Sequence, residues 1–258
     1  MKRHKNGVLP ALAALMIALG TLIIITRGQD QTDRPSSKAP DVTPIREGVM
    51  TETQRRHSKL YENRRNRKLR DLPSPVDLVV STPWGSSPEE NIPRTLDEFL
   101  RVSVCSADAV VVGIVKNKSS QLTDEGTFIF TDSEMTVEEI LKNNSSANIQ
   151  PRDDVLLTRP GGAVELNGKI LRVTDRSFKP LEVEHKYLVF LRFIPATGAY
   201  QQLNSKSAFE LSQNRVNKLT EEEFLFPFVS DETNPIALVA QVRAVAINCK
   251  NDPERGAK

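Results

Sequence analysis

Histidine and acidic residues form one cluster with the composition of a metal site. Glu182, Glu184 and His185 are close in the chain, and carboxylate oxygens and imidazole nitrogens can both bind metal ions. The same residues lead directly into an apolar strand pattern, which favours an exposed charged turn instead. His4 and His57 lie in basic segments, so we expect neither of them in a pocket.

Motifs for nucleophilic, zinc or phosphate chemistry are not found in the sequence. It contains no Gly-x-Ser-x-Gly, no His-Glu-x-x-His and no glycine-rich phosphate loop. Glu138 and Glu139 are adjacent carboxylates, but neighbours on a strand point to opposite faces and cannot act on one substrate. We therefore predict no catalytic residues, no metal ligands, no cofactor and no enzymatic activity.

The two cysteines, Cys105 and Cys249, bracket the C-terminal part of the chain. In a reducing cytosol they would be ordinary thiols, whereas outside a membrane an even pair predicts one disulfide. A disulfide that closes so long a loop is worth roughly 3–5 kcal/mol in the chain-entropy treatment. The predicted pairing therefore depends on export.

A basic run lies upstream of the cysteines, with Glu62 as the one acid inside it. Such a run can contact anionic lipid headgroups or another polyanion, and a solvated spacer is the alternative. Its basic residues are Arg55, Arg56, Lys59, Arg64, Arg65, Arg67, Lys68 and Arg70.

The excess of positive over negative charge lies in the N-terminal part. The whole chain has a formal net charge of +2, but residues 105–258 carry 18 Lys and Arg against 21 Asp and Glu, a net charge of −3. Binding to a phosphate backbone needs a basic face. We therefore expect no nucleic-acid partner.

Residues 8–26 contain no charged side chain and follow the basic residues Lys2, Arg3 and Lys5. At about 1.5 Å per residue this segment just spans a hydrocarbon core of about 30 Å. It predicts a signal anchor with the remainder of the chain outside the cytoplasm, or alternatively a cleaved signal peptide. Residues 27–93 are rich in proline and partly basic, which predicts a disordered tether.

Residues 94–258 have the pattern of a mainly β domain. Thr95 and Glu98 form a capping box that predicts a short helix before Cys105, and Asn234-Pro235 predicts the start of a C-terminal helix. Asn167-Gly168 predicts a tight hairpin. The apolar run 109–115 is typical of a strand buried on both faces. Further strands are expected at 127–131 and 135–141 (one long strand bent near 132–133), and at 154–158, 163–166, 169–173, 187–194 and 200–203.

These elements predict a small OB-type barrel of about five to seven strands, with a short preceding helix and a C-terminal helix. Residues 105–115, Cys-Ser-Ala-Asp-Ala-Val-Val-Val-Gly-Ile-Val, resemble the Cys-x-Ala-Asp-Val-Val strand of metalloproteinase inhibitors and netrin-like modules. Leu141-Lys142 and Tyr187-Leu-Val-Phe-Leu191 also resemble that family, over about residues 105–211. The resemblance implies an OB-type barrel.

The sequence departs from the inhibitors in two respects. Those proteins use a free N-terminal cysteine to reach the catalytic zinc, whereas Cys105 lies far from the N-terminus. Their dense disulfide framework is also missing.

We therefore expect a membrane-tethered binding module outside the cytoplasm, with a protein or glycan partner and with the membrane contacted through residues 8–26. If the segment is cleaved, the module is secreted or periplasmic. Regulation or inhibition of an extracytoplasmic metalloprotease is the alternative function.

Overall fold

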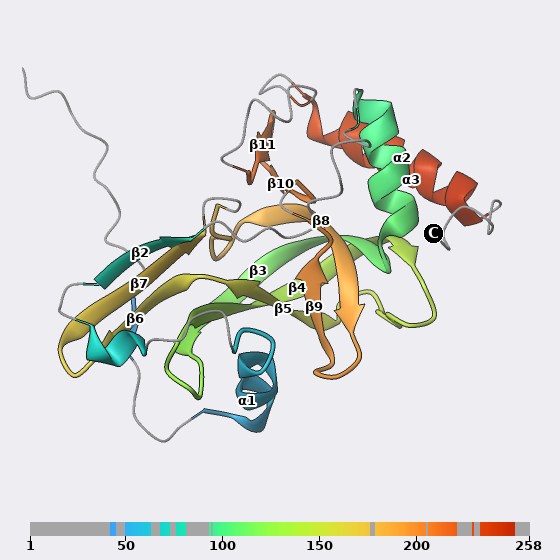
Figure 1. Ribbon diagram of the computed structural model, residues 1–258. Coiled ribbons are helices and arrows are strands. Elements are labelled where there is room, and N and C mark those ends of the chain that lie inside the picture. The colour runs from blue at the N-terminus through green and yellow to red at the C-terminus, as the bar shows by residue number, and fades with distance from the viewer. Residues whose placement is uncertain are drawn as a thin grey trace, which may run out of the picture. The chain divides into compact units, whose positions relative to one another are not determined.

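The computed structural model describes residues 42–44, 50–62, 68–72, 76–80, 93, 95–175, 179–204, 206–220, 229 and 233–250. This part of the chain is mainly β, with its strands in two sheets (Figure 1). The predicted membrane segment, residues 8–26, lies outside the described residues. Within the described ranges no helix is long and apolar enough to cross a membrane.

A long antiparallel pair, β3 (Ala109–Leu122) and β4 (Ile129–Asn143), forms the middle of the larger sheet. The two expected segments, 127–131 and 135–141, merge into the single strand β4. Pairing is regular at Asp132 and Ser133, where a bend was expected. The irregularities lie elsewhere, at three register shifts between Val110 and Asn117 of β3. An inserted residue at such a shift bends the strand without breaking it.

The larger sheet has the order β11-β10-β8-β3-β4-β5-β9, and an additional pairing joins β8 to β9. That pairing closes the five strands β8, β3, β4, β5 and β9 on themselves. β5 (Asp154–Pro160) meets β9 (Ala199–Gln202) in parallel, while β8 (Lys186–Ile194) is antiparallel to both β3 and β9. β10 (Ala208–Leu211) and β11 (Val216–Lys218) extend the sheet from β8.

The smaller sheet is built on the hairpin of β6 (Gly162–Leu166) and β7 (Lys169–Asp175). Asn167 and Gly168 connect these strands with φ of +53° and +72°, which confirms the predicted tight turn. β1 (Thr43–Pro44) pairs in parallel with β6, and β2 (Val76–Val80) pairs in parallel with β7.

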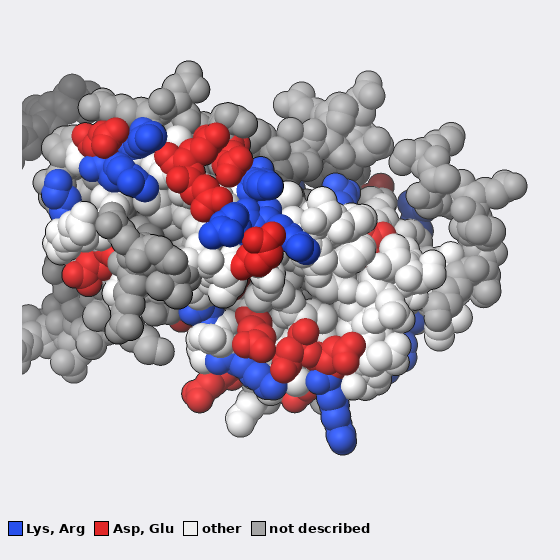
Figure 2. Space-filling view, turned by 90° about the horizontal axis from the view of Figure 1, so that it is seen from below, with Lys and Arg blue, Asp and Glu red and all other residues white. Residues whose placement is uncertain are grey.

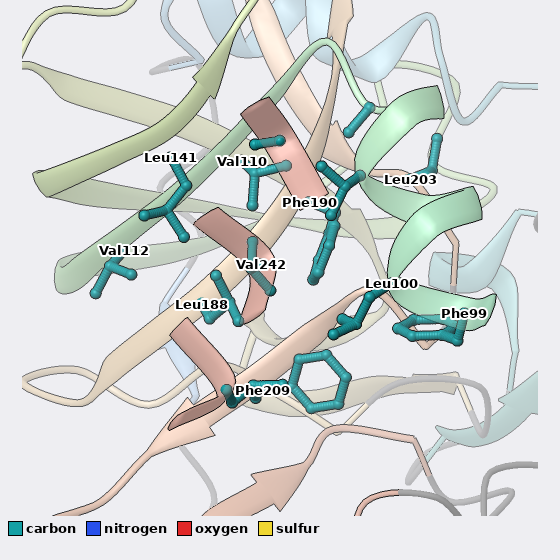
Figure 3. Close-up of a cluster of buried hydrophobic side chains, with 14 of the residues drawn as sticks. Phe99, Leu100, Val110, Val112, Leu141, Leu188, Phe190, Leu203, Phe209 and Val242 are labelled. Atoms are coloured by element: carbon teal, nitrogen blue, oxygen red, sulfur yellow. The ribbon is translucent and has the colours of Figure 1, made fainter. Parts of the chain in front are cut away.

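β3 is buried on both faces, as its apolar run predicts. Val111 and Val115 face a core inside the closed strands, with Met135, Leu157 and Tyr200. The alternate residues of β3 face a second core under two helices, α2 (Leu96–Ser106) and α3 (Pro235–Lys250). This second core draws its residues from α2, β3, β8, β10 and α3. Figure 3 labels several of them: Phe99, Leu100, Val110, Val112, Leu188, Phe190, Phe209 and Val242.

Both helices begin where the sequence predicts. The hydroxyl of Thr95 accepts a hydrogen bond from the Glu98 N–H at 3.2 Å. The Asn234 side chain accepts from the N–H groups of Ile236 and Ala237 at 2.8 and 3.2 Å. Cys105 lies within α2, although the family resemblance places it on a strand, because the helix continues to Ser106 before β3 begins.

The predicted disordered tether, residues 27–93, is folded over part of its length. α1 (Glu52–Ser58), the 3₁₀ turn η1 (Leu69–Asp71) and strands β1 and β2 all fall within it, and the compact unit begins at Pro40 instead of residue 94. The proline-rich composition of the whole range conceals β2, which is itself a short apolar run, Val-Asp-Leu-Val-Val. An apolar count misses α1 because its His57 docks through a polar side chain.

Gly113 on β3 gives a first prediction, because its α-carbon faces β4 at close range. A Cβ at this position would lie 2.5 Å from the Thr136 carbonyl oxygen and 2.7 Å from Cγ of Met135. We expect Gly113→Ala to lower the free energy of unfolding by about 1–3 kcal/mol, as overpacking does. Urea denaturation measures the change. Gly168→Asn is the control, because nothing lies within 4 Å there and Asn tolerates positive φ. Equal stability of the Gly113→Ala variant and the wild type would contradict the prediction.

Candidate functional site

The N-terminal helix α1 lies on the side of the larger sheet away from α2 and α3 (Figure 1). Thr51 caps it through a capping box: its Oγ1 accepts from the Gln54 N–H at 3.2 Å, and its own N–H donates to Gln54 Oε1 at 2.8 Å. The helix has only seven residues. An isolated helix of that length does not persist in water, so α1 depends on its contacts with the sheet.

Two side chains make those contacts, one at the end of α1 and one in the turn that follows it. The imidazole of His57 is fully buried, and its Nδ1 lies 2.8 Å from Oδ2 of Asp132 on β4. The Tyr61 hydroxyl lies 3.3 Å from Oγ1 of Thr158 on β5 and accepts from the Gln201 amide on β9 at 3.2 Å. His57 therefore sits in a buried polar contact, contrary to the expectation that it lies in an open basic segment.

The receiving surface, which we call the β4–β5–β9 face, consists of Asp132, Thr158, Gln201, Phe128 and Phe130. Asp132 and Thr158 are directly opposite in the β4–β5 ladder. Phe130 shares their side of β4 because alternate residues of a strand face the same way. The Tyr61 ring stacks on Phe130 with centroids 5.4 Å apart, and on Phe128 at 6.2 Å.

The turn between β3 and β4 completes the contact with the N-terminal segment. The N–H of Asp124 donates to the Ser58 hydroxyl at 2.8 Å, and the N–H of Leu69 donates to the Gly126 carbonyl at 2.7 Å. Leu69 and Tyr61 also enter the third apolar core, which they share with β4, β6 and β7. The segment therefore engages both a sheet face and the adjoining turn.

A histidine hydrogen-bonded to a carboxylate resembles the His–Asp pair of some active sites, in which the carboxylate orients the histidine that acts as general base. A general base must reach the proton of its substrate, directly or through one water. Nε2 of His57 is buried, and no described residue gives it a hydrogen-bond partner. The pair thus has no route to a substrate while α1 is docked, and its geometry is that of a docking contact.

The suspected metal ligands around His185 do not converge. His185 is half-exposed and its Nδ1 lies 2.7 Å from Glu210 Oε1, while the Glu182 N–H donates to the Tyr187 hydroxyl at 2.8 Å. Burial raises the pKa of Tyr187 to about 12. Among the residues that the structure describes, no group of three or more His, Cys, Asp or Glu is placed to hold a metal ion.

The adjacent carboxylates of β4 have separate basic partners, and Glu138 lies at a register shift of the β3–β4 ladder, so the alternation expected of strand neighbours does not apply to it. Glu138 pairs with Lys186 of β8 at 2.6 Å, and Glu139 pairs with Arg243 of α3. The two side chains therefore have partners on different elements.

Cys105 and Cys249 form the predicted disulfide, with Cα atoms 5.4 Å apart, and link α2 to α3. Beside it, the buried side chain of Lys142 donates to three carbonyl oxygens, those of Val104 at 2.8 Å, Cys105 at 2.8 Å and Ala107 at 2.6 Å. Burial lowers the pKa of Lys142, and the negative charge of Asp108 acts in the opposite direction. An ammonium group thus satisfies the carbonyls at the end of α2.

The basic run does not form a patch of one sign on the described surface. Glu52 lies 3.4 Å from both Arg55 and Arg56 on α1. In Figure 2, a view from the α1 side, basic and acidic side chains gather in the same clusters. Contact with a polyanion stays a prediction. Arg55, Arg56, Lys59, Lys68 and Arg70 are exposed, while Arg64, Arg65 and Arg67 lie outside the described residues.

Sequence patterns do not single out Asp132, Thr158 or Gln201, because isolated polar residues within strands usually face water. Leu60, Tyr61 and Leu69 are the only local signal, as the few apolar residues of the basic segment. Comparison with protein-family models and with curated proteins finds no match for the chain.

Lys142 yields a second prediction. We expect Lys142→Met to lower the free energy of unfolding by about 2 kcal/mol or more, because buried carbonyls lose their donor. Urea denaturation under oxidising conditions measures the loss. Lys116→Met is the matched control: Lys116 pairs with Asp154 at 3.0 Å, but both side chains are largely exposed, so less than about 1 kcal/mol should be lost. Equal losses in the two variants would show that the Lys142 contacts contribute no more than a surface pair.

Proposed function

We propose that the chain is a binding module built on an OB-type barrel and held outside the cytoplasm by residues 8–26. The order β8-β3-β4-β5-β9, closed by the β8–β9 pairing, carries the proposal. Its first four strands follow the Greek-key order, in which the fourth strand returns beside the first. A five-stranded Greek-key barrel is the OB architecture, whose ligands bind on the face of the second and third strands.

In this chain the second and third strands of the barrel are β4 and β5. Their outer face combines the aromatic ring of Phe130, and that of Phe128 just before β4, with the polar groups of Asp132 and Thr158. Aromatic surface with a few convergent polar groups is typical of binding sites. The partner class that we propose is a protein or a glycan, since the net charge of −3 over residues 105–258 disfavours a polyphosphate backbone.

The disulfide supports a location outside the cytoplasm. Structural disulfides persist in oxidising compartments and are rare in the cytosol. Cys105–Cys249 joins positions 144 residues apart in the chain, so it constrains almost the whole barrel. Together with the apolar segment at residues 8–26, it favours an anchored module, or a secreted or periplasmic one if that segment is cleaved.

Regulation or inhibition of an extracytoplasmic metalloprotease is the second proposal, based on the resemblance of residues 105–115. Cys105 lies inside α2 with its sulfur bonded to Cys249. A mechanism through a free N-terminal cysteine would therefore require cleavage before Cys105. Loss of metalloprotease activity in proportion to the added chain would favour this proposal over a module without effect on proteases.

If the chain is exported, Cys105 and Cys249 should be joined as a disulfide in cells. In cells lysed directly into an alkylating reagent without reductant, we expect Cys105 and Cys249 to stay unmodified, and both to react after reduction in denaturant. Peptide mass spectrometry reads the modification. A chain that lacks residues 1–26 is the control, because it should remain in the cytoplasm with both thiols reactive. Reactive cysteines in the full-length chain would argue against export.

Binding is tested with the full chain, purified in detergent, as bait for an extracytoplasmic extract. We expect a partner that is retained saturably, and that is lost after treatment of the extract with either protease or glycosidase. The reduced and alkylated chain serves as the unfolded control. Retention by the unfolded control alone, or no saturable partner at all, would contradict the binding-module proposal.

A further inference from the structure

The face that OB-type barrels use for ligands is occupied here by the chain itself. The N-terminal segment, residues 50–62, covers β4 and β5 with His57 and Tyr61, and reaches β9 through Gln201. It also contacts the turn after β3, where Ser58 accepts from Asp124. Both parts of the general OB binding surface, the sheet face and the adjoining loop, are therefore filled from within the molecule.

The chemistry of this contact differs from that of the helices on the other side. α2 and α3 are held by an apolar core and a covalent bond. The N-terminal segment is held by hydrogen bonds between side chains and by the ring of Tyr61, which enters the third apolar core. Water replaces these hydrogen bonds when the contact opens, so the main loss on opening is the exposure of the Tyr61 ring, which is much less apolar surface than the core beneath α2 and α3.

Two buried atoms in the contact remain without a hydrogen bond to any described residue, Nε2 of His57 and Oδ1 of Asp132. A buried polar atom without a partner costs free energy that is recovered on exposure to water. The seven-residue helix adds no stability of its own once it leaves the sheet. Opening of this segment is therefore less costly than opening of the barrel.

We propose that the β4–β5–β9 face is a binding site for a short helix that presents an imidazole in its last turn and a phenol four residues later, in the turn that follows the helix. Residues 50–62 occupy this site in the isolated chain. A partner with the same chemistry binds to the face by displacing them. The inference rests on the proposed binding function and deepens it, because it names the surface and its regulation. The resident segment has an effective concentration of about millimolar, as short tethers give, so a weak partner does not displace it.

A synthetic peptide of residues 50–62, labelled with a fluorophore, tests the proposal by anisotropy. The acceptor is the full chain with His57→Ala and Tyr61→Ala, which empties the site and leaves the face unchanged. We expect saturable binding to this variant, and at least tenfold weaker binding to the wild type. A chain with Arg55→Ala and Lys59→Ala is the matched control, since these residues are exposed on the same segment, and it should behave as the wild type.

A peptide that carries the two alanines should not bind any of the three chains. No binding to the emptied variant, with cooperative urea unfolding retained, would overturn the proposal, and so would equal binding to all three chains. If the double variant does not fold, His57→Gln with Tyr61→Phe replaces it: the ring still stacks on Phe130 and supports folding, the hydroxyl contacts with Thr158 and Gln201 are lost, and the peptide should bind more tightly than it does to the wild type.

Amide hydrogen exchange of the wild-type chain gives a second measurement that needs no variant. We expect residues 52–58 to exchange faster than β3, through opening of the segment while the barrel stays closed. Exchange as slow as that of β3 would overturn the proposal. A partner captured by the full chain and unaffected by excess peptide would overturn this inference alone, and would leave the binding-module proposal standing.

Discussion

The pairing of β8 with β3 on one edge and β9 on the other is the constraint on which the structure depends. It closes the five strands and at the same time fixes which side of β8 faces each core. Leu188 and Phe190 face the helices, whereas Val189 and Leu191 face the interior. A slip of one residue would exchange these faces, so the register is set by two cores together. The long β3–β4 pair can bend around the barrel because its register shifts accommodate curvature.

Elements outside the barrel are attached by two kinds of contact. On one side, Phe99, Leu100 and Val242 bury apolar surface, and Cys105–Cys249 makes the attachment of α2 to α3 covalent. Lys142 closes the same region by satisfying the last carbonyls of α2. On the other side, α1 and the turn after it are attached through hydrogen bonds between side chains and through the buried ring of Tyr61. An apolar and covalent attachment and a largely polar one thus lie on opposite sides of one sheet.

His57 illustrates how burial decides what a residue can do. With Asp132 at 2.8 Å, the imidazole has the neighbour that orients a catalytic base. Its other nitrogen is buried without a hydrogen bond to any described residue, so it cannot take a proton from a substrate. The same two side chains instead position a helix on a sheet. Tyr61 acts alongside, because its ring stacks on Phe130 while its hydroxyl reaches both β5 and β9.

The sequence by itself determined the local features of the fold. Helix capping predicts the start of α2 at Thr95 and of α3 at Asn234. Turn geometry predicts the Asn167-Gly168 hairpin, and burial on two faces predicts the apolar strand β3. The presence of two cysteines also predicted the Cys105–Cys249 disulfide. Only the tertiary structure decided the role of the N-terminal segment and the position of the candidate site. Asp132, Thr158 and Gln201 lie on three different strands, and His57 and Tyr61 reach them from 75 to 140 positions away in the chain. No local pattern encodes such contacts, because they form only once the sheet has closed and its edge strands have paired through their backbones.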